Sequence, residues 1–156
     1  MAQIRHIAIS SDNPTKTAEF YKQAMGLTEV ARFNLPPGVV EDAPRPSTVV
    51  LTDGHISLAI LKFGKDQTGV GLDYQGLHHI GFVVDDPEAW TKHIEAHGAP
   101  NITRPEDMPK TAHWEIKFRG PDNVVFDISH LEWPGAATVE QDTKSIPVAA
   151  AKVAAE

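Results

Sequence analysis

The sequence predicts an α+β fold in which two βαβββ modules form mixed sheets that curl around a shared cleft, with the helices outside. Segments with alternating apolar residues recur along the chain, and each half contains one helix that starts at a proline. The two halves also match in the order and spacing of these elements, which indicates duplication of one unit. A chain of 156 residues, 41% of them hydrophobic, suffices for two small modules that share a core.

The first module is expected to begin with a strand over Arg5–Ser10, where apolar residues alternate with small or polar ones. Asn13 and Pro14 then supply the N-cap and first position of a helix that ends near Met25. The prolines of residues 34–46 predict a long loop. Three further strands complete the module, the last two joined by an Asp-Gly hairpin signal: Glu29–Asn34, Ser47–Asp53 and His55–Phe63.

The same order of elements is expected in the second half. A strand over Leu77–Asp85 leads into a helix that starts at Asp86-Pro87 and runs to about His97. A weak strand near Ile102 and two strands around a Gly-Pro-Asp-Asn turn follow: His113–Arg119 and Val124–Leu131. The predicted division is a first module at 1–64, a glycine-rich linker at 65–76, a second module at 77–132 and an Ala-rich tail at 133–156. The tail is expected to be a poorly specified terminus or a short docked helix.

The internal repeat pairs His6 with His79, and at the same offset it pairs Asn13-Pro14 with Asp86-Pro87. Because residues i and i+2 share a face of a sheet, each central strand has one apolar face, suited to packing under the helices. The opposite, mixed faces carry small residues and line the predicted cleft. The cleft is expected to bring together residues from strands that are equivalent under the repeat: His6, His79 and Asp127, with Ala59 at the fourth equivalent position.

Composition and charge exclude several classes of function. With 14 basic and 21 acidic residues the net charge is −7, so a nucleic-acid partner is not expected. The absence of cysteine excludes a disulfide framework and a thiolate metal site. No signal peptide is visible, and no apolar run approaches the roughly 18 residues that span a bilayer. The expectation is a cytoplasmic protein without a membrane partner.

Three segments resemble the vicinal oxygen chelate superfamily of glyoxalases, bleomycin-resistance proteins, fosfomycin-resistance enzymes and extradiol dioxygenases: Arg5–Ile9, Leu77–Val83 and Phe118–Ile128. The resemblance covers about residues 4–131. It implies a homodimer and a metal site formed by His6, His79 and Asp127. The family most often has glutamate in place of Asp127, and Ala59 stands where glyoxalases and epimerases have a fourth protein ligand.

Two histidines and one carboxylate with open positions are the arrangement of non-haem Fe(II) oxygenases. The first hypothesis is therefore a metal-dependent enzyme that binds a small substrate through two adjacent oxygens, leaning to an extradiol-type ring-cleaving dioxygenase. Fe(II) is the expected ion, and Mn(II) or another divalent ion fits similar ligands. Two alternatives stay open: a glyoxalase-like lyase, isomerase or thiol transferase with Mn(II) or a similar ion, and a metal-free protein that binds an aromatic small molecule.

A polar set in the strand predicted over His113–Arg119 adds candidates for chemistry. His113, Glu115 and Lys117 alternate with apolar residues, so they face either the cleft or the solvent side of an edge strand. On the cleft side, His113 is the leading candidate for a catalytic acid or base, and Lys117 is a candidate substrate contact.

His55 and Ser57 fall on the predicted cleft face of their strand, and both are candidate substrate contacts. His78 lies next to His79 and is therefore expected to point to the opposite face of the sheet. The prediction for His78 is a structural role, or at most a contact that supports a residue of the site.

Overall fold

The computed structural model describes residues 2–38, 40–104, 106, 115–131 and 133–136. These residues form a mixed sheet in the order β2-β3-β4-β1-β5-β7-β6, with helices α1 (Pro14–Met25) and α2 (Pro87–Ala96). The strands are β1 (Gln3–Ser10), β2 (Thr28–Phe33), β3 (Ser47–Thr52), β4 (Ser57–Lys62), β5 (Gly76–Val83), β6 (Ile116–Arg119) and β7 (Val125–Ser129). The predicted α+β fold class is confirmed. Within the described residues, no helix is long and apolar enough to cross a membrane.

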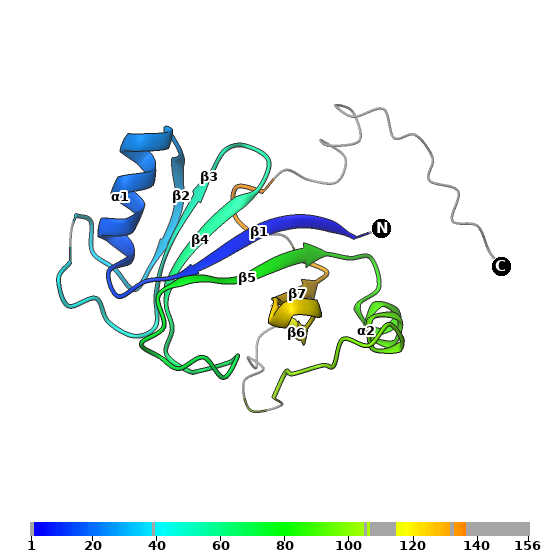
Figure 1. Cartoon of the computed structure of the whole chain (residues 1–156). Helices are drawn as coiled ribbons and strands as arrows, with labels where there is room; N and C mark the ends of the chain where they lie inside the picture. The colour runs from blue at the N-terminus through cyan, green and yellow to red at the C-terminus, as the bar shows by residue number, and fades with distance from the viewer. Residues whose placement is uncertain (1, 39, 105, 107–114, 132, 137–156) are drawn as a thin grey trace.

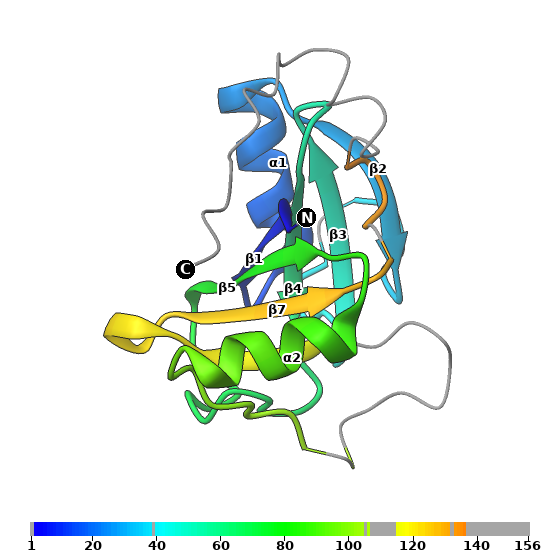
Figure 2. The ribbon, with the colours of Figure 1, turned by 90° about the vertical axis from the view of Figure 1, so that its right-hand side faces the viewer.

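Two parallel strand pairs repeat the same arrangement on either side of the centre of the sheet. β1 pairs in parallel with β4, β5 pairs in parallel with β7, and the antiparallel pair β1–β5 joins the two halves. Figures 1 and 2 show α1 beside β2, β3 and β4, and α2 at the opposite end of the sheet, beside β7. The opening strands of the two halves therefore lie side by side at the middle of the sheet.

Both helices begin with the predicted caps. The Asn13 side chain accepts a hydrogen bond from the Lys16 amide at 3.0 Å, and the Asp86 side chain accepts from Glu88 and Ala89 at 3.1 Å. Gly26 ends α1 with a φ of +73°, a left-handed conformation that glycine adopts without steric cost.

Each helix covers one part of the sheet and forms a separate core. The first core consists of Ala18, Val49, Leu51 and Ile60, and the second consists of Val84, Ala99, Ile116, Phe118 and Ile128. Ile7, Ile9 and Ile80 on the two central strands are only half-buried, although the sequence predicted packing under the helices. The two cores account for the difference, because they lie over the flanking strands.

The strand predicted near Ile102 is reduced to an isolated bridge between Asn101 and Phe118 within the described residues. A side chain accounts for this, because the Thr103 hydroxyl accepts the hydrogen bond of the Lys117 amide at 2.6 Å. The Ile102 amide donates to the Lys117 carbonyl at 2.8 Å. A hydroxyl therefore takes a place that a backbone carbonyl has in a regular ladder.

Candidate metal centre

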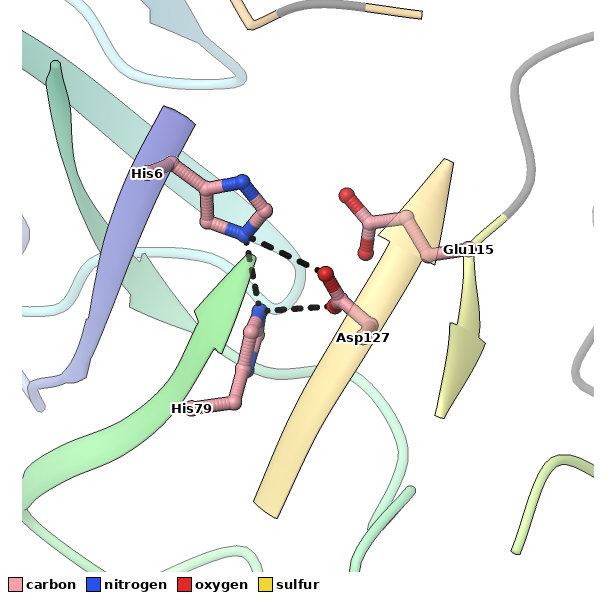
Figure 3. A group of neighbouring side chains, drawn as sticks. All are labelled: His6, His79, Glu115 and Asp127. Carbon is pink, nitrogen blue, oxygen red and sulfur yellow. Dashed lines mark hydrogen bonds and ion pairs between the residues drawn. The ribbon is translucent and has the colours of Figure 1, made fainter. Parts of the chain in front are cut away.

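Four side chains with metal-binding groups converge on the concave side of the sheet (Figure 3). His6 comes from β1, His79 from β5 and Asp127 from β7, and Glu115 immediately precedes β6. One donor atom of each lies within 4.8 Å of the others. His6 and His79 are 3% exposed and Asp127 is fully buried. The structure thus places the three predicted metal ligands together and adds Glu115.

Strand register explains why these residues meet. His6 pairs with Gly81 across the antiparallel strands β1 and β5, and Gly81 pairs with Asp127 across the parallel strands β5 and β7. Gly81 therefore lies between His6 and Asp127, and its missing side chain leaves room for the His6 ring. A Cβ atom on Gly81 would lie 1.8 Å from His6 Cε1 and 2.1 Å from His6 Nδ1.

The substitution Gly81→Ala is expected to weaken divalent-metal binding by about tenfold or more, because the His6 ring must leave its position and its nitrogen leaves the group. Titration of the purified protein with a competing metal chelator measures the affinity. Gly64→Ala is the matched control, since a Cβ there meets its nearest atom, in Pro46, at 3.2 Å. Unchanged metal affinity in Gly81→Ala would contradict the assignment of His6 as a ligand.

The donor atoms fit a divalent metal ion. The two ring nitrogens His6 Nε2 and His79 Nε2 are 3.1 Å apart, and His79 Nε2 lies 3.1 Å from Asp127 Oδ2. Adjacent donors around an octahedral ion with bonds of about 2.1 Å are about 3 Å apart, which matches these spacings. Asp127 Oδ1 is buried without a hydrogen-bond partner among the described residues, 3.8 Å from His6 Nε2. A buried carboxylate oxygen of this kind is otherwise costly, and an ion would satisfy it.

Burial keeps His79 in the form that binds metal. It lowers the pKa of His79 well below its ordinary value, and the charges of Lys117 and His6 act in the same direction. The ring is therefore neutral at neutral pH, and one nitrogen carries a free lone pair. Burial also raises the pKa of Asp127, and the Lys117 ammonium at 2.6 Å opposes that rise.

Lys117 is a buried cation inside the group. Its Nζ donates to Asp127 Oδ2 at 2.6 Å and to Glu115 Oε2 at 3.1 Å. Burial acts to lower the pKa of Lys117, but the two carboxylates outweigh it and raise the pKa above its ordinary value. Burial acts to raise the pKa of Glu115, but Lys117, His6 and Trp133 together lower it to about 2. Both oxygens of Glu115 are engaged, because Oε1 accepts from Trp133 Nε1 at 2.6 Å.

His78 does not point away from the site as the sequence predicted. Its Nδ1 lies 2.7 Å from Nδ1 of His79. The reason is a β-bulge: Ala8 pairs with His79 and the next residue, Ile9, pairs with Leu77, so His78 is the extra residue. A bulge interrupts the alternation of faces, and it lets both rings lie on one side.

A directional hydrogen-bond chain follows from this contact. If His79 presents a bare Nε2 to the site, its Nδ1 carries the proton and donates to His78 Nδ1. His78 then carries its own proton on Nε2, which lies 3.2 Å from the Thr68 hydroxyl. Burial, with the charge of Lys117, lowers the pKa of His78 to about 4, so the ring is a neutral acceptor at neutral pH. Phe63 stacks on His78 at 4.1 Å between ring centroids.

The predicted substrate contacts lie in different surroundings. The Ser57 hydroxyl is buried and donates to the Pro134 carbonyl at 2.6 Å, so its contacts support the backbone of the C-terminal segment. His55 is exposed in the turn between β3 and β4, where its amide donates to Asp53. Lys117 lies within the group, and His113 lies outside the described residues. Substrate contact by these residues, and acid or base chemistry by His113, stay predictions.

Trp133 is a site residue that sequence reasoning missed, because it stands where the Ala-rich tail begins. Its ring centroid lies 4.8 Å from that of His6, and its indole N–H holds Glu115. The segment is fixed to the first half by Ser57 and by Thr52, whose hydroxyl donates to the Gly135 carbonyl at 2.6 Å. The sequence left open whether Glu115 faces the cleft or the solvent, and it did not predict Glu115 as a possible ligand. A cavity of about 480 Å³ is lined by Trp133, Glu115 and His79, among others.

Comparison with solved structures identifies similar folds. A hypothetical protein from Bacillus halodurans has 16% identity and a TM-score of 0.59, covering 81% of this chain and 92% of that one. A variant methylmalonyl-CoA epimerase from Streptomyces coelicolor, in complex with 2-nitronate-propionyl-CoA, has 20% identity and a TM-score of 0.58, covering 81% and 94%. A variant 4-hydroxymandelate synthase from the same organism has 14% identity and a TM-score of 0.63, covering 86% of this chain and 40% of that one. At these identities the likeness concerns the fold.

No curated protein sequence matches the chain. A family model does match it, over residues 3–128. These residues include His6, His79, Glu115, Lys117 and Asp127. The chain therefore belongs to the Glyoxalase/Bleomycin resistance protein/Dioxygenase superfamily.

Proposed function

We propose that the protein is a divalent-metal-dependent enzyme that acts on a small substrate with two adjacent oxygens, as a ring-cleaving dioxygenase of the extradiol type with Fe(II). The observation that carries this proposal is the group formed by His6, His79 and Asp127. Two imidazole nitrogens lie beside a cavity, together with a buried carboxylate oxygen that has no hydrogen-bond partner among the described residues. Two histidines and one carboxylate, which leave further positions open, are the ligand set of non-haem Fe(II) oxygenases.

The residues of the chain have separable roles in this proposal. His6, His79 and Asp127 hold the ion, and His78 fixes the proton of His79 on the nitrogen that faces away from the site. Trp133 and Lys117 hold Glu115 at the edge of the cavity. When bound, the ion supplies Lewis-acid stabilisation of the enolate or catecholate form of the substrate. Trp133 also contacts the His6 ring, with the ring centroids 4.8 Å apart.

Two other functions have an observation in their favour. Glu115 offers a fourth oxygen donor within 4.8 Å of the others, which suits a lyase, isomerase or thiol transferase that uses Mn(II) or a similar ion. Lys117 already supplies a positive charge to Asp127 and Glu115, which suits a metal-free protein that binds an aromatic compound. The homodimer implied by the family resemblance and the cytoplasmic location expected from the sequence stay predictions.

Metal analysis combined with oxygen uptake tests the proposal. Protein purified anaerobically without an affinity tag is expected to contain close to one equivalent of iron and to consume oxygen with catechol-type substrates. The variant His79→Ala is expected to lose both, while His97→Ala, at the exposed end of α2, is the matched histidine control and keeps both. Manganese, nickel or zinc without oxygen uptake would move the assignment to the isomerase or lyase class. No metal after reconstitution with Fe(II) and Mn(II) would leave a binding protein.

A further inference from the structure

The cavity beside the candidate metal centre is lined by two chemically different sets of residues. His79, Glu115 and Trp133 line it where it meets the metal-binding group. The basic residues that line it are Arg45, Lys62 and Lys65. Its volume of about 480 Å³ lies within the range of small-molecule sites.

The charge of this cavity is opposite to that of the whole chain. The protein carries a net charge of −7, yet the described lining of the cavity contains three basic residues and one acid, Glu115. That acid already pairs with Lys117 at 3.1 Å. The charged residues of the lining are therefore mainly basic, which favours an anion.

Arg45 is held in place mainly by two backbone carbonyls. One guanidinium nitrogen donates to the carbonyls of Phe63 and Leu72, both at 2.9 Å. The other lies 3.5 Å from Asp12 and 3.6 Å from Asp73, two exposed carboxylates. Long ion pairs at the surface contribute little, so a ligand carboxylate can compete for this nitrogen.

Aromatic rings with fixed planes also line the cavity. Phe63 stacks on His78 with an interplanar angle of 24° and a centroid separation of 4.1 Å. The Trp133 indole is fixed by its hydrogen bond to Glu115. Leu61 adds an aliphatic contact. Rings held in this way offer flat surfaces to a planar ligand at low entropic cost.

We infer that the cavity binds a planar aromatic carboxylate, with the carboxylate at Arg45 and Lys65 and the ring toward Phe63 and Trp133. This inference rests on the proposed function, because the other end of the same molecule then presents its adjacent oxygens at His79 and Glu115. It narrows the substrate class from vicinal-oxygen compounds in general to those that carry an anionic group on an aromatic ring.

Binding of a matched pair of probes tests the inference. Protocatechuate and its methyl ester share the ring and the two hydroxyls, and they differ in the negative charge. Calorimetric titration is done under anaerobic conditions with chelator-treated protein and with Mn(II)-loaded protein. The acid is expected to bind about tenfold or more tightly than the ester, as for a charge-assisted hydrogen bond, and the preference is expected to shrink at high salt.

Variants then locate the anion site. Arg45→Met and Lys65→Met are each expected to lower the affinity for the acid about tenfold and to leave that for the ester unchanged. Lys92→Met removes the same charge from the exposed face of α2, outside the cavity lining, and is the control. Melting temperatures confirm folding, and Lys65→Met keeps the test valid if the loss of Arg45 unfolds the protein.

Two outcomes of these titrations separate the anion site from the metal-dependent function. Equal affinities for the acid and the ester, or no binding of either, would overturn the inference whatever metal the protein holds. A preference for the acid that persists in protein unable to take up Fe(II) or Mn(II) would support the inference and overturn the metal-dependent function.

Discussion

Asp127→Asn is expected to lower divalent-metal affinity by more than about 100-fold, the upper end of the loss seen when only a supporting residue is removed. The change keeps the size of the side chain and removes its charge. Asp127 supplies the buried oxygen, Oδ1, that has no hydrogen-bond partner among the described residues. Since the two histidines are neutral ligands, Asp127 is the residue that brings negative charge to them. Its Oδ2 lies 3.1 Å from His79 Nε2, and its Oδ1 lies 3.8 Å from His6 Nε2. Chelator competition and elemental analysis measure the loss.

Glu115→Gln is the matched control for this experiment. Glu115 belongs to the same group, yet both of its oxygens are occupied, by Trp133 at 2.6 Å and by Lys117 at 3.1 Å. Its neutral analogue is therefore expected to change metal affinity by about tenfold or less, as a supporting residue would. If both variants lose metal equally, Glu115 is a ligand, and the three-ligand assignment is wrong. If neither loses metal, the centre lies elsewhere.

The convergence of His6, His79 and Asp127 could be predicted because it depends on regular features. Strand alternation decides which face a residue occupies, and the internal repeat decides which strands are equivalent. In the structure β1 and β5 lie side by side, and β7 pairs with β5 in the register that joins Gly81 to Asp127. The helix starts were also predictable, because each cap, Asn13 or Asp86, bonds to a residue two or three positions further along the chain.

The errors arise where the backbone departs from regular alternation. His78 was expected on the far face, but a bulge turns it toward His79, and one sequence carries no signal for a bulge. The strand near Ile102 is shortened because Thr103 bonds to the backbone of Lys117 through its side chain. Such contacts depend on tertiary structure, and propensity does not reveal them.

Contacts between distant segments explain what was missed at the site. Trp133 reaches His6 only because the segment after β7 is fixed by Ser57 and Thr52 on the first half of the chain. Alternation placed Ser57 on the concave face, but it could not show that its hydroxyl would be taken by the Pro134 carbonyl. Strand alternation also could not predict the partners of Lys117, because it indicates which face of the sheet a residue occupies and not which charged residues lie beside it.

Lys117→Met is expected to destabilise the metal-free protein by about 3–5 kcal/mol, the usual cost of removing one partner of a buried ion pair. The ammonium of Lys117 lies between Asp127 at 2.6 Å and Glu115 at 3.1 Å, and its side chain is 6% exposed. Methionine fills much of the same volume but leaves the two carboxylates without their cation. Urea unfolding of chelator-treated protein measures the change in the free energy of unfolding.

Lys22→Met is the matched control at the surface. Lys22 also pairs with two carboxylates, Glu19 at 2.8 Å and Glu29 at 3.3 Å, but its side chain is 32% exposed. Exposed ion pairs of this kind contribute about 1 kcal/mol or less, so the control is expected to stay close to the wild type. Equal losses in the two variants would show that burial does not set the cost at Lys117.

Added Mn(II) separates the two roles that Lys117 can have. A divalent ion held by His6, His79 and Asp127 restores positive charge beside the carboxylates, so it is expected to stabilise Lys117→Met by more than it stabilises the wild type. In the wild type the ammonium and the ion compete for the Asp127 carboxylate, at Oδ2. Loss of Lys117 is therefore expected to tighten metal binding even as it weakens the metal-free fold. If Mn(II) stabilises neither protein, Lys117 is the permanent cation of a metal-free binding site.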